Sequence, residues 1–259
     1  MEIKDFKEKT GSFKKTVSKG LFLAIQAGVK FFYPVPELKN TDNLPEEAFV
    51  YVGNHAQMNG PITAQLYYPG KPYIWTIGEM MNLKEVPAYA YEDFWRHKKN
   101  KLFYKALSYI IAPLSVIVFN NARTIAVYHD ARLLKTIRES MDKLDEGKSI
   151  VIFPENRNSY NNIVDDFEEH FVDLARYYYR KSKKRLVFVP VYHAVNLNEV
   201  YFGKGIKYNP DNSIDTERER ICDYLKKEIT NIAVSLPVHK VIPYDNIGKK
   251  NYVLNKAEN

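Results

Sequence analysis

The sequence has few features that would cross-link or divide the chain. It contains a single cysteine, Cys222, among 259 residues, so no internal disulfide can form, which fits a reducing compartment. Cys222 lies within a pattern of helical spacing, and we expect a small buried thiol there rather than a nucleophile. No Pro-, Gly- or Ser-rich linker, low-complexity tract or internal repeat interrupts the sequence. We therefore expect one large α/β domain.

Long hydrophobic runs are also missing. The two longest, residues 21–33 and 107–119, are interrupted by Lys30 and Pro113 and are shorter than the roughly 20 apolar residues that span a bilayer. Met1 leads into a stretch of mixed charge, which is not the pattern of a signal peptide. We therefore expect a cytoplasmic protein that at most lies on a membrane.

Positive charge and aromatic side chains are abundant. The formal net charge is +7, and the chain has 20 Tyr and 14 Phe, which favours an anionic partner such as acidic lipid, nucleic acid or a phosphorylated small molecule. In residues 1–40 a Lys-rich stretch precedes an apolar one that ends at Pro34, as in a basic amphipathic helix on a membrane surface. The alternative is a solvated leader and a helix packed on the domain. The lysines that flank the apolar residues are Lys14, Lys15, Lys19 and Lys30.

Residues 41–240 alternate between strand-like and helix-like patterns. Apolar, β-branched runs predict strands at residues 48–52, 73–77, 115–119, 149–153 and 186–191, with an edge strand within 200–208. Helical spacing predicts helices near residues 134–147, 167–178 and 216–232, the first ended by Gly147 and the last capped by Thr216 and Glu219. This alternation predicts an α/β fold with a mostly parallel mixed sheet flanked by helices. Residues 241–259 are expected to form a loosely packed tail.

Four short blocks with chemical potential follow or end apolar runs. Such positions, at the carboxyl ends of strands, are where α/β folds place their reactive groups. Among the residues of these blocks, His55 is the natural candidate for a general base. The blocks are Asn54-His55, Arg123, Phe153-Pro154-Glu155 and Val189-Pro190-Val191.

The order and spacing of these blocks resemble the glycerolipid acyltransferases of the lysophosphatidate acyltransferase-like type, over roughly residues 49–191. The resemblance implies an acyltransferase-like fold, His55 as the base and Arg123 on the phosphate of the acceptor. The segment containing Glu79-Met80 and Pro87 is similar to the one between the family's first two motifs. The matching residues are Asn54, His55 and Pro61 in the first motif, Arg123 in the second, Phe153-Pro154-Glu155 and Ser159 in the third, and Val189-Pro190-Val191 in the fourth.

The first motif departs from the family at two positions. The family has an Asp five residues after the His and a Ser two residues after it, whereas this chain has Gly60 and Gln57. In the family the Asp accepts a hydrogen bond from the His ring, which fixes its tautomer and raises its basicity. Gly60 cannot do this. The groups that could take over are the amides of Gln57 and Asn59 and the carboxylates of Glu79, Asp130 and Glu155.

The third motif departs as well. The family continues Gly-Thr-Arg-Ser where this chain has Asn156-Arg157-Asn158-Ser159. Arg157 stands one residue earlier than the family's Arg, which helps to hold the glycerol phosphate. Either the loop tolerates this shift and the guanidinium still binds phosphate, or Arg157 points to solvent. An altered or non-phosphorylated acceptor is therefore consistent with the sequence.

Other polar clusters have simpler interpretations. The basic, aromatic residues 95–104 form either a solvated loop or a patch that contacts lipid headgroups. The basic residues at 180–185 suit the end of a helix, and His129-Asp130 is expected to be a surface pair. The remaining histidines lack the spacing of metal ligands, so no metal site is predicted. They are His97, His170, His193 and His239.

The sequence thus predicts a peripheral, cytoplasmic acyltransferase that moves a fatty acyl group from acyl-CoA or acyl carrier protein to a lysophospholipid or glycerol-phosphate-like acceptor. An anionic membrane surface is a predicted partner and nucleic acid is not. No cofactor is needed, because the thioester is already activated. The alternative is a protein of the same fold that has lost its catalytic pair and binds lipid. The predicted catalytic residues are His55 and Glu155, and the predicted substrate-binding residues are Asn54, Arg123, Asn156, Arg157 and Ser159.

Overall fold

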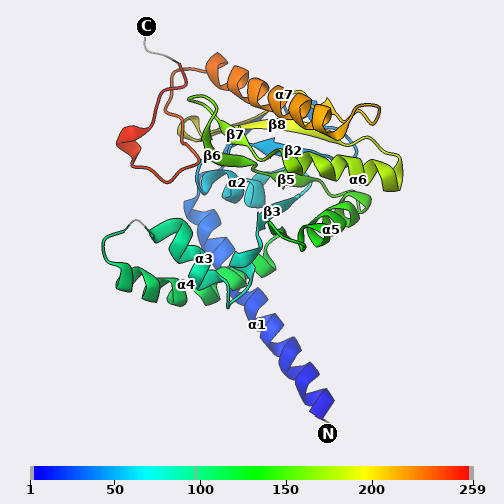
Figure 1. Ribbon diagram of the computed structural model, residues 1–259. Coiled ribbons are helices and arrows are strands. Elements are labelled where there is room, and N and C mark those ends of the chain that lie inside the picture. Colours follow the sequence, from blue (N-terminus) through cyan, green and yellow to red (C-terminus); the bar gives the residue numbers. More distant parts are fainter. Residues whose placement is uncertain (1–2, 97, 257–259) are drawn as a thin grey trace. The chain divides into compact units, whose positions relative to one another are not determined.

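A computed structural model of the protein describes residues 3–96 and 98–256, with side chains from Thr16 onward, so His97 and the side chains of Lys14 and Lys15 lie outside the described part. The chain forms two compact units (Figure 1). The first comprises Met1–Pro34 and Thr76–Leu133, and the second comprises Val35–Trp75 and Leu134–Asn259. The boundaries predicted from the sequence at residues 40 and 240 stay a prediction.

A mostly parallel sheet organises the second unit. The strand order is β1-β9-β8-β2-β5-β3-β4, with β10 on β8, and β4 belongs to the first unit together with the end of β3. The pairs β1–β9, β8–β2, β2–β5 and β5–β3 are parallel, whereas β9 and β10 pair with β8 antiparallel. The strands are β1 (Glu37–Lys39), β2 (Val50–Gly53), β3 (Tyr73–Ile77), β4 (Thr124–Val127), β5 (Ile150–Ile152), β8 (Val187–Ala194), β9 (Glu199–Phe202) and β10 (Ile206–Lys207).

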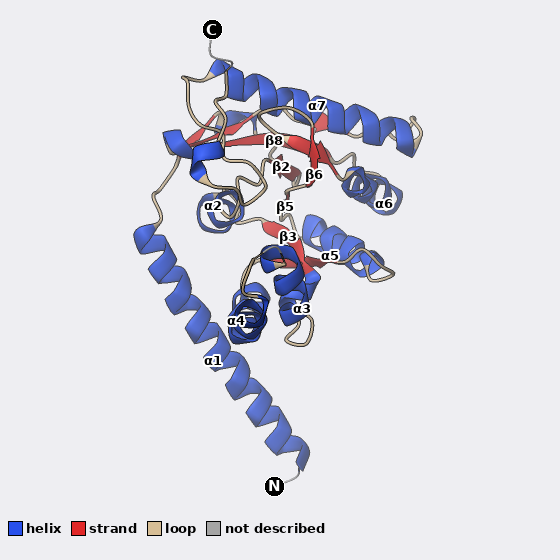
Figure 2. Ribbon diagram, turned by 60° about the vertical axis from the view of Figure 1, so that its left-hand side comes forward, coloured by secondary structure: helices blue, strands red, loops and turns tan. Residues whose placement is uncertain are grey.

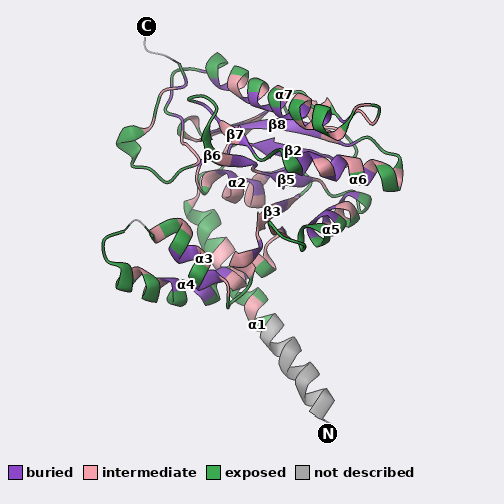
Figure 3. Ribbon diagram, viewed as in Figure 1, coloured by how far each residue is buried: buried purple, intermediate pink, exposed green. Residues whose placement is uncertain are grey.

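Helices cover both faces of this sheet (Figure 2). On one face Ala64 of α2 (Asn59–Tyr67) and the following Tyr68 join a core with side chains such as Tyr51 and Val189. Because successive side chains of a strand point to opposite faces, Phe188 lies on the other face, where its ring contacts Phe171 at 5.7 Å. The central strands are almost entirely buried (Figure 3). The elements of the second face are α5 (Leu133–Asp145), η4 (Glu169–Val172), α6 (Asp173–Ser182) and α7 (Ile214–Ser235).

Two smaller features complete the second unit. A hairpin of β6 (Glu155–Ser159) and β7 (Asp165–Phe167) follows β5. Residues 237–256 are here called the C-terminal strap. The tail at 241–259 was expected to pack loosely, yet Val241 and Asn255 are 2% and 3% exposed and Asn255 Nδ2 donates to the Ala233 carbonyl at 2.7 Å. The remaining short turns are η1 (Thr41–Asn43), η5 (Val195–Leu197) and η6 (Lys249–Asn251).

The first unit is helical apart from β4 and the end of β3. Its elements are α1 (Ile3–Phe32), η2 (Gly78–Met81), α3 (Val86–Ala90), the π-turn η3 (Tyr91–Trp95) and α4 (Lys101–Asn121). Ser115 Oγ of α4 donates to the Met80 carbonyl at 2.8 Å, and Asn121 Nδ2 donates to Ser18 Oγ of α1 at 2.8 Å. Among the described helices α4 alone is long and apolar enough to cross a membrane, with 21 residues and a mean hydropathy of 1.8 in its most apolar window.

Most predicted elements are present, with three corrections. The strand predicted at residues 115–119 is wrong, because this β-branched segment forms the second half of α4, which continues through Pro113. The helix predicted near residues 167–178 begins only at Asp173, since Phe167 belongs to β7. The cap predicted at Thr216 is also wrong: Ser213 caps α7 by accepting the Thr216 N–H at 3.1 Å.

Candidate functional site

Three of the four sequence blocks meet at one edge of the sheet. In the parallel register of β2, β5 and β8, Val52 pairs with Ile152 and Gly53 pairs with Val191. The segments that follow these strands therefore begin side by side. Asn54-His55 follows β2 and Phe153-Pro154-Glu155 follows β5, while Val189-Pro190-Val191 lies within β8, whose next residues are Tyr192 and His193. Arg123, the fourth predicted element, belongs to the first unit, between α4 and β4.

The imidazole of His55 is oriented by a backbone carbonyl. Its Nδ1 contacts the carbonyl oxygen of Gln57. A carbonyl can only accept, so Nδ1 carries the hydrogen and Nε2 keeps its lone pair. Burial lowers the pKa of His55 below its usual 6.5. The rings of Phe153 and Tyr244 each lie 5.2 Å from the imidazole. His55 is therefore a neutral, fixed ring whose Nε2 can accept a proton.

An unusual turn brings this carbonyl back to His55. Ala56 and Gln57 adopt left-handed conformations with φ of 47° and 56°. Such conformations cost about 1–2 kcal/mol for each L-residue, so the surrounding contacts must offset them. The Asn59 side chain helps by donating to the Ala56 carbonyl at 2.9 Å. The group that contacts the ring is the backbone carbonyl of Gln57, which was not among the side-chain amides and carboxylates considered from the sequence.

Position 60 has no space for a side chain. A Cβ on Gly60 would lie 2.7 Å from the His55 carbonyl oxygen and 2.8 Å from a ring carbon of Phe153. Both distances are shorter than real Cβ contacts, and one partner is backbone that cannot easily move. The residue is buried at the start of α2, where its N–H donates to the same His55 carbonyl at 3.1 Å. The local backbone is thus built around glycine.

Glu155 supports the backbone of His55 rather than its ring. One carboxyl oxygen accepts the His55 N–H and the other accepts the Asp165 N–H at 3.1 Å. The side chain is buried, and burial raises the pKa of Glu155 to about 8, although both N–H donors favour the charged form. Glu155 therefore joins the His55 turn to the β6–β7 hairpin.

A second histidine that the sequence analysis set aside lies beneath the turn. The His193 N–H donates to Asn54 Oδ1 at 2.7 Å, and Nδ1 donates to the Asn54 carbonyl at 3.0 Å. The Tyr68 hydroxyl then donates to His193 Nε2 at 2.8 Å. Burial lowers the pKa of His193 to about 4. The available signal was its position two residues after Val191, which places it on the same face of β8.

Asn54 is therefore a buried structural partner of His193 in this geometry. Its side chain is 1% exposed, and its Nδ2 has no hydrogen-bond partner within the described residues. The other predicted substrate-binding residues of this unit lie on β6. The Asn156 side chain accepts the Asn158 N–H at 2.7 Å, Ser159 is exposed, and Arg157 Nε lies 3.7 Å from Asp245 of the C-terminal strap.

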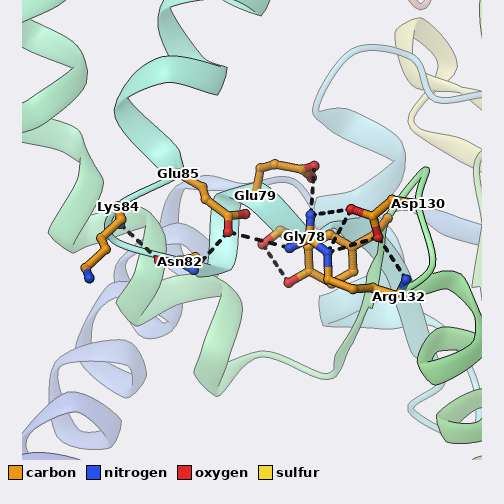
Figure 4. Close-up of polar contacts among 8 residues, drawn as sticks. Gly78, Glu79, Asn82, Lys84, Glu85, Asp130 and Arg132 are labelled. Atoms are coloured by element: carbon orange, nitrogen blue, oxygen red, sulfur yellow. Dashed lines mark hydrogen bonds and ion pairs between the residues drawn. The ribbon is translucent and has the colours of Figure 1, made fainter.

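Two carboxylates considered as partners of His55 interact with an arginine of the first unit (Figure 4). Arg132 Nη2 lies 2.7 Å from Asp130 and 4.0 Å from Glu79. Its guanidinium also stacks on the Tyr128 ring at 3.7 Å. Arg132 lowers the pKa of Asp130, whereas the predicted surface pair with His129 contributes less. Asp130 and Glu79 thus form part of an ion-pair cluster around Arg132.

Within the described ranges no group of three or more His, Cys, Asp or Glu side chains could hold a metal ion.

Comparison with known proteins gave a match among solved structures. No protein-family model matches the chain, and no curated protein sequence matches it. Among solved structures, the chain is similar to the 1-acyl-sn-glycerophosphate (LPA) acyltransferase PlsC from Thermotoga maritima, with a TM-score of 0.44 and 13% sequence identity. That alignment covers 85% of this chain and 83% of the PlsC chain.

Proposed function

We propose that this chain is an acyltransferase that transfers a fatty acyl group from acyl-CoA or acyl carrier protein to the hydroxyl of a lysophospholipid or glycerol-phosphate-like acceptor. The observation that carries the proposal is the His55 imidazole, whose Nδ1 is held by the Gln57 carbonyl, so that the neutral ring keeps its lone pair on Nε2. It lies where the carboxyl ends of parallel strands meet. The motif order along the sequence supports the same reaction class.

In the proposed reaction, His55 Nε2 takes the proton of the acceptor hydroxyl while its oxygen attacks the carbonyl carbon of the thioester. The tetrahedral intermediate collapses with cleavage of the carbon–sulfur bond, and the imidazolium returns the proton to the departing thiolate. Glu155 acts as a positioning residue through the His55 N–H. The thioester supplies the activation, so the proposed step uses no cofactor.

The acceptor would be held by positive side chains. We assign Arg157 to this role because it is exposed on the hairpin that carries Glu155, and a guanidinium binds two phosphate oxygens at once. Asn156 and Ser159 of the same strand offer polar contacts beside it. Arg123 is assigned to the acceptor phosphate on the sequence resemblance. Asn54 is assigned to the site through its place between His55 and His193.

A lipid substrate implies that the protein binds a membrane surface, and α4 has an exposed side suited to such binding. Its exposed side is apolar, with Leu102 and Ile110 81% and 73% exposed, while its buried side carries Ser108 and Ser115. This pattern is the reverse of a helix on the surface of a soluble domain. Because the buried side packs on other elements of its unit, we propose that α4 lies in the membrane plane. The exposed apolar residues are Leu102, Phe103, Ala106, Tyr109, Ile110, Pro113 and Leu114.

Basic side chains beside this apolar stripe fit anionic headgroups. Lys98, Lys99, Lys101 and Lys105 are all exposed at or near the start of α4. They belong to or adjoin the basic, aromatic tract 95–104, so the headgroup-contacting interpretation of that tract is favoured over a simple solvated loop. Phe31 and Phe32 at the end of α1 add exposed aromatic surface to the same unit. We propose peripheral attachment to a cytoplasmic membrane face.

The test is thiol release from acyl-CoA, and deacylation of acyl carrier protein, by the full chain with lysolipids of different headgroups. Wild type is expected to turn over at least one acceptor, and His55→Ala should lower kcat/KM by about 10²–10⁴-fold. His170→Ala is the matched control, because His170 has a 71% exposed side chain. Equal rates for wild type and His55→Ala would remove His55 from the mechanism.

The alternative function is lipid binding without catalysis, and Gly60 is the observation that favours it. Saturable binding of lysolipid, together with no turnover by wild type for any donor and acceptor, would support this alternative. Turnover that depends on His55 would exclude it.

A further inference from the structure

Gln57 is attached at both ends. Its carbonyl oxygen contacts His55 Nδ1. Its side-chain Nε2 donates to the Tyr252 hydroxyl at 3.0 Å and to the Asp245 carbonyl at 3.2 Å, and both acceptors belong to the C-terminal strap. The residue that orients the imidazole is therefore connected to a segment almost 190 residues away in the sequence.

The strap is anchored at both of its ends. Lys240 and Leu254 form an antiparallel bridge, and the Val241 N–H donates to the Val253 carbonyl at 2.8 Å. At the base the buried His239 contacts the Tyr192 hydroxyl at 2.8 Å, and its N–H donates to Asn255 at 2.9 Å. The residues between these anchors form a closed loop. Tyr252 therefore lies next to fixed backbone, which limits how far its hydroxyl can move.

The loop of the strap faces the site with three side chains. The Tyr244 ring lies 5.2 Å from the His55 ring. The Asp245 carboxylate lies 3.7 Å from Arg157, which we assign to the acceptor. Tyr252 holds Gln57. The strap thus contacts the proposed base, the residue that orients it and the proposed acceptor ligand.

The turn at Ala56 and Gln57 requires outside support. Both residues have positive φ without being glycine, and such conformations persist when surrounding contacts determine them. The two hydrogen bonds from Gln57 Nε2 are contacts of this kind. Without them the turn would lose two of the contacts that help to keep the Gln57 carbonyl at Nδ1.

We propose that the C-terminal strap is part of the site, with Gln57 and Tyr252 as positioning residues that take the place of the missing dyad Asp. Tyr252 and the Asp245 carbonyl hold the Gln57 side chain, the Gln57 carbonyl fixes the Nδ1–H tautomer of His55, and Nε2 is left as the base. A carbonyl orients the ring but adds no full negative charge, so the ring keeps a low proton affinity. The consequence for catalysis rests on the proposed function, whereas the consequence for the tautomer does not.

The experiment compares wild type with Tyr252→Phe and Gln57→Leu by ¹⁵N NMR of the histidine imidazoles, assigned with His55→Ala. In wild type His55 should be the Nδ1–H tautomer. Both variants should shift it toward the mixture of tautomers of a free imidazole. Tyr177→Phe, at an exposed tyrosine of α6, is the matched control and should leave the His55 signals unchanged.

Kinetics on the same proteins test the catalytic consequence. Tyr252→Phe removes one hydrogen bond, and we expect kcat to fall about three- to tenfold with KM little changed. Should Gln57→Leu fail to fold, Tyr252→Phe, which removes only a hydroxyl, decides the question. Unchanged His55 tautomers in the folded variants would overturn the proposal. If the variants shift the His55 tautomer but wild type shows no acyl transfer, the positioning role is supported and the acyltransferase assignment is wrong.

Discussion

At position 60 the backbone of α2 approaches the His55 carbonyl and the Phe153 ring so closely that a Cβ would clash. Introducing an Asp at this position, as in the acyltransferases that the sequence resembles, should therefore not create a catalytic dyad. We expect Gly60→Asp and Gly60→Ala each to lower the free energy of unfolding by about 2–4 kcal/mol, because backbone must move to admit the side chain. Urea unfolding measures the change.

The matched control is Gly28→Ala in α1, where the added Cβ would meet no atom within 4 Å apart from its chain neighbours and the backbone of its own helix. That variant should be neutral or more stable by up to about 1 kcal/mol, since Ala favours a helix. If Gly60→Asp instead leaves stability unchanged and raises acyl transfer, the close packing described for this site is incorrect.

A second residue-scale prediction concerns Glu155 and pH. Its pKa is raised to about 8 in the folded protein from 4.5, so the folded state keeps a proton that the unfolded state loses. Its stabilising effect is complete below pH 4.5 and is lost as pH rises toward 8. His193, with its pKa lowered to about 4, acts oppositely, because stability falls as pH drops from 6.5 toward 4. The window from pH 6.5 to 8 isolates Glu155 from His193.

In that window we expect the free energy of unfolding of wild type to fall by about 1 kcal/mol per pH unit, as one proton is released. The glutamine of Glu155→Gln cannot titrate, so the free energy of unfolding of this variant should not fall over the same pH range. Urea titrations at pH 6.5, 7 and 8 give the slopes. Parallel slopes for the two proteins would show that another group carries the dependence.

At the scale of elements, apolar sequence runs predicted the strands correctly where both faces of the strand are buried. The apolar runs at 73–77, 149–153 and 186–191 are strands because the sheet is covered on both faces. The same reasoning failed at residues 115–119. There the apolar residues belong to a helix with an exposed apolar side, and period alone does not distinguish a buried strand from such a segment.

Some residues of the candidate site could be predicted from the sequence and others could not. His55 and Glu155 were predicted because they follow apolar runs and match motifs of the acyltransferases that the sequence resembles. The roles of Gln57, His193 and Tyr252 were not predicted, because they depend on which distant segments meet. The carbonyl of Gln57 has no sequence signature, since every residue has one.

The exposed side of α4 leads to a prediction for this element. Ile110→Glu places a charge in the centre of the apolar stripe and should reduce binding to anionic vesicles by about tenfold or more, because burying a carboxylate in the membrane interface is unfavourable. Vesicle sedimentation measures it. Leu134→Glu, at a 63% exposed leucine of α5, is the control. Equal losses for both variants would assign the effect to charge rather than to the stripe.

At the scale of the whole molecule, the two units contribute different parts of the proposed activity. The second unit holds His55 and its positioning residues, and the first holds α4 and Arg123. The net charge of +7 acts on association with any anionic partner. A lipid partner and a nucleic-acid partner can therefore be distinguished by the binding affinity that remains when salt screens the electrostatic attraction.

Raising the salt from 0.1 to 1 M shortens the Debye length from about 10 Å to about 3 Å and should weaken vesicle binding. Binding that rests on charge alone would disappear, whereas the apolar stripe of α4 should leave a residual affinity, because salt does not weaken apolar burial. We expect wild type to retain vesicle binding at 1 M salt and Ile110→Glu to lose it, with sedimentation as the readout. Single-stranded RNA should compete with vesicles for the protein only at low salt. Full displacement of wild type from vesicles by RNA at every salt concentration would contradict a lipid surface and favour nucleic acid as the anionic partner.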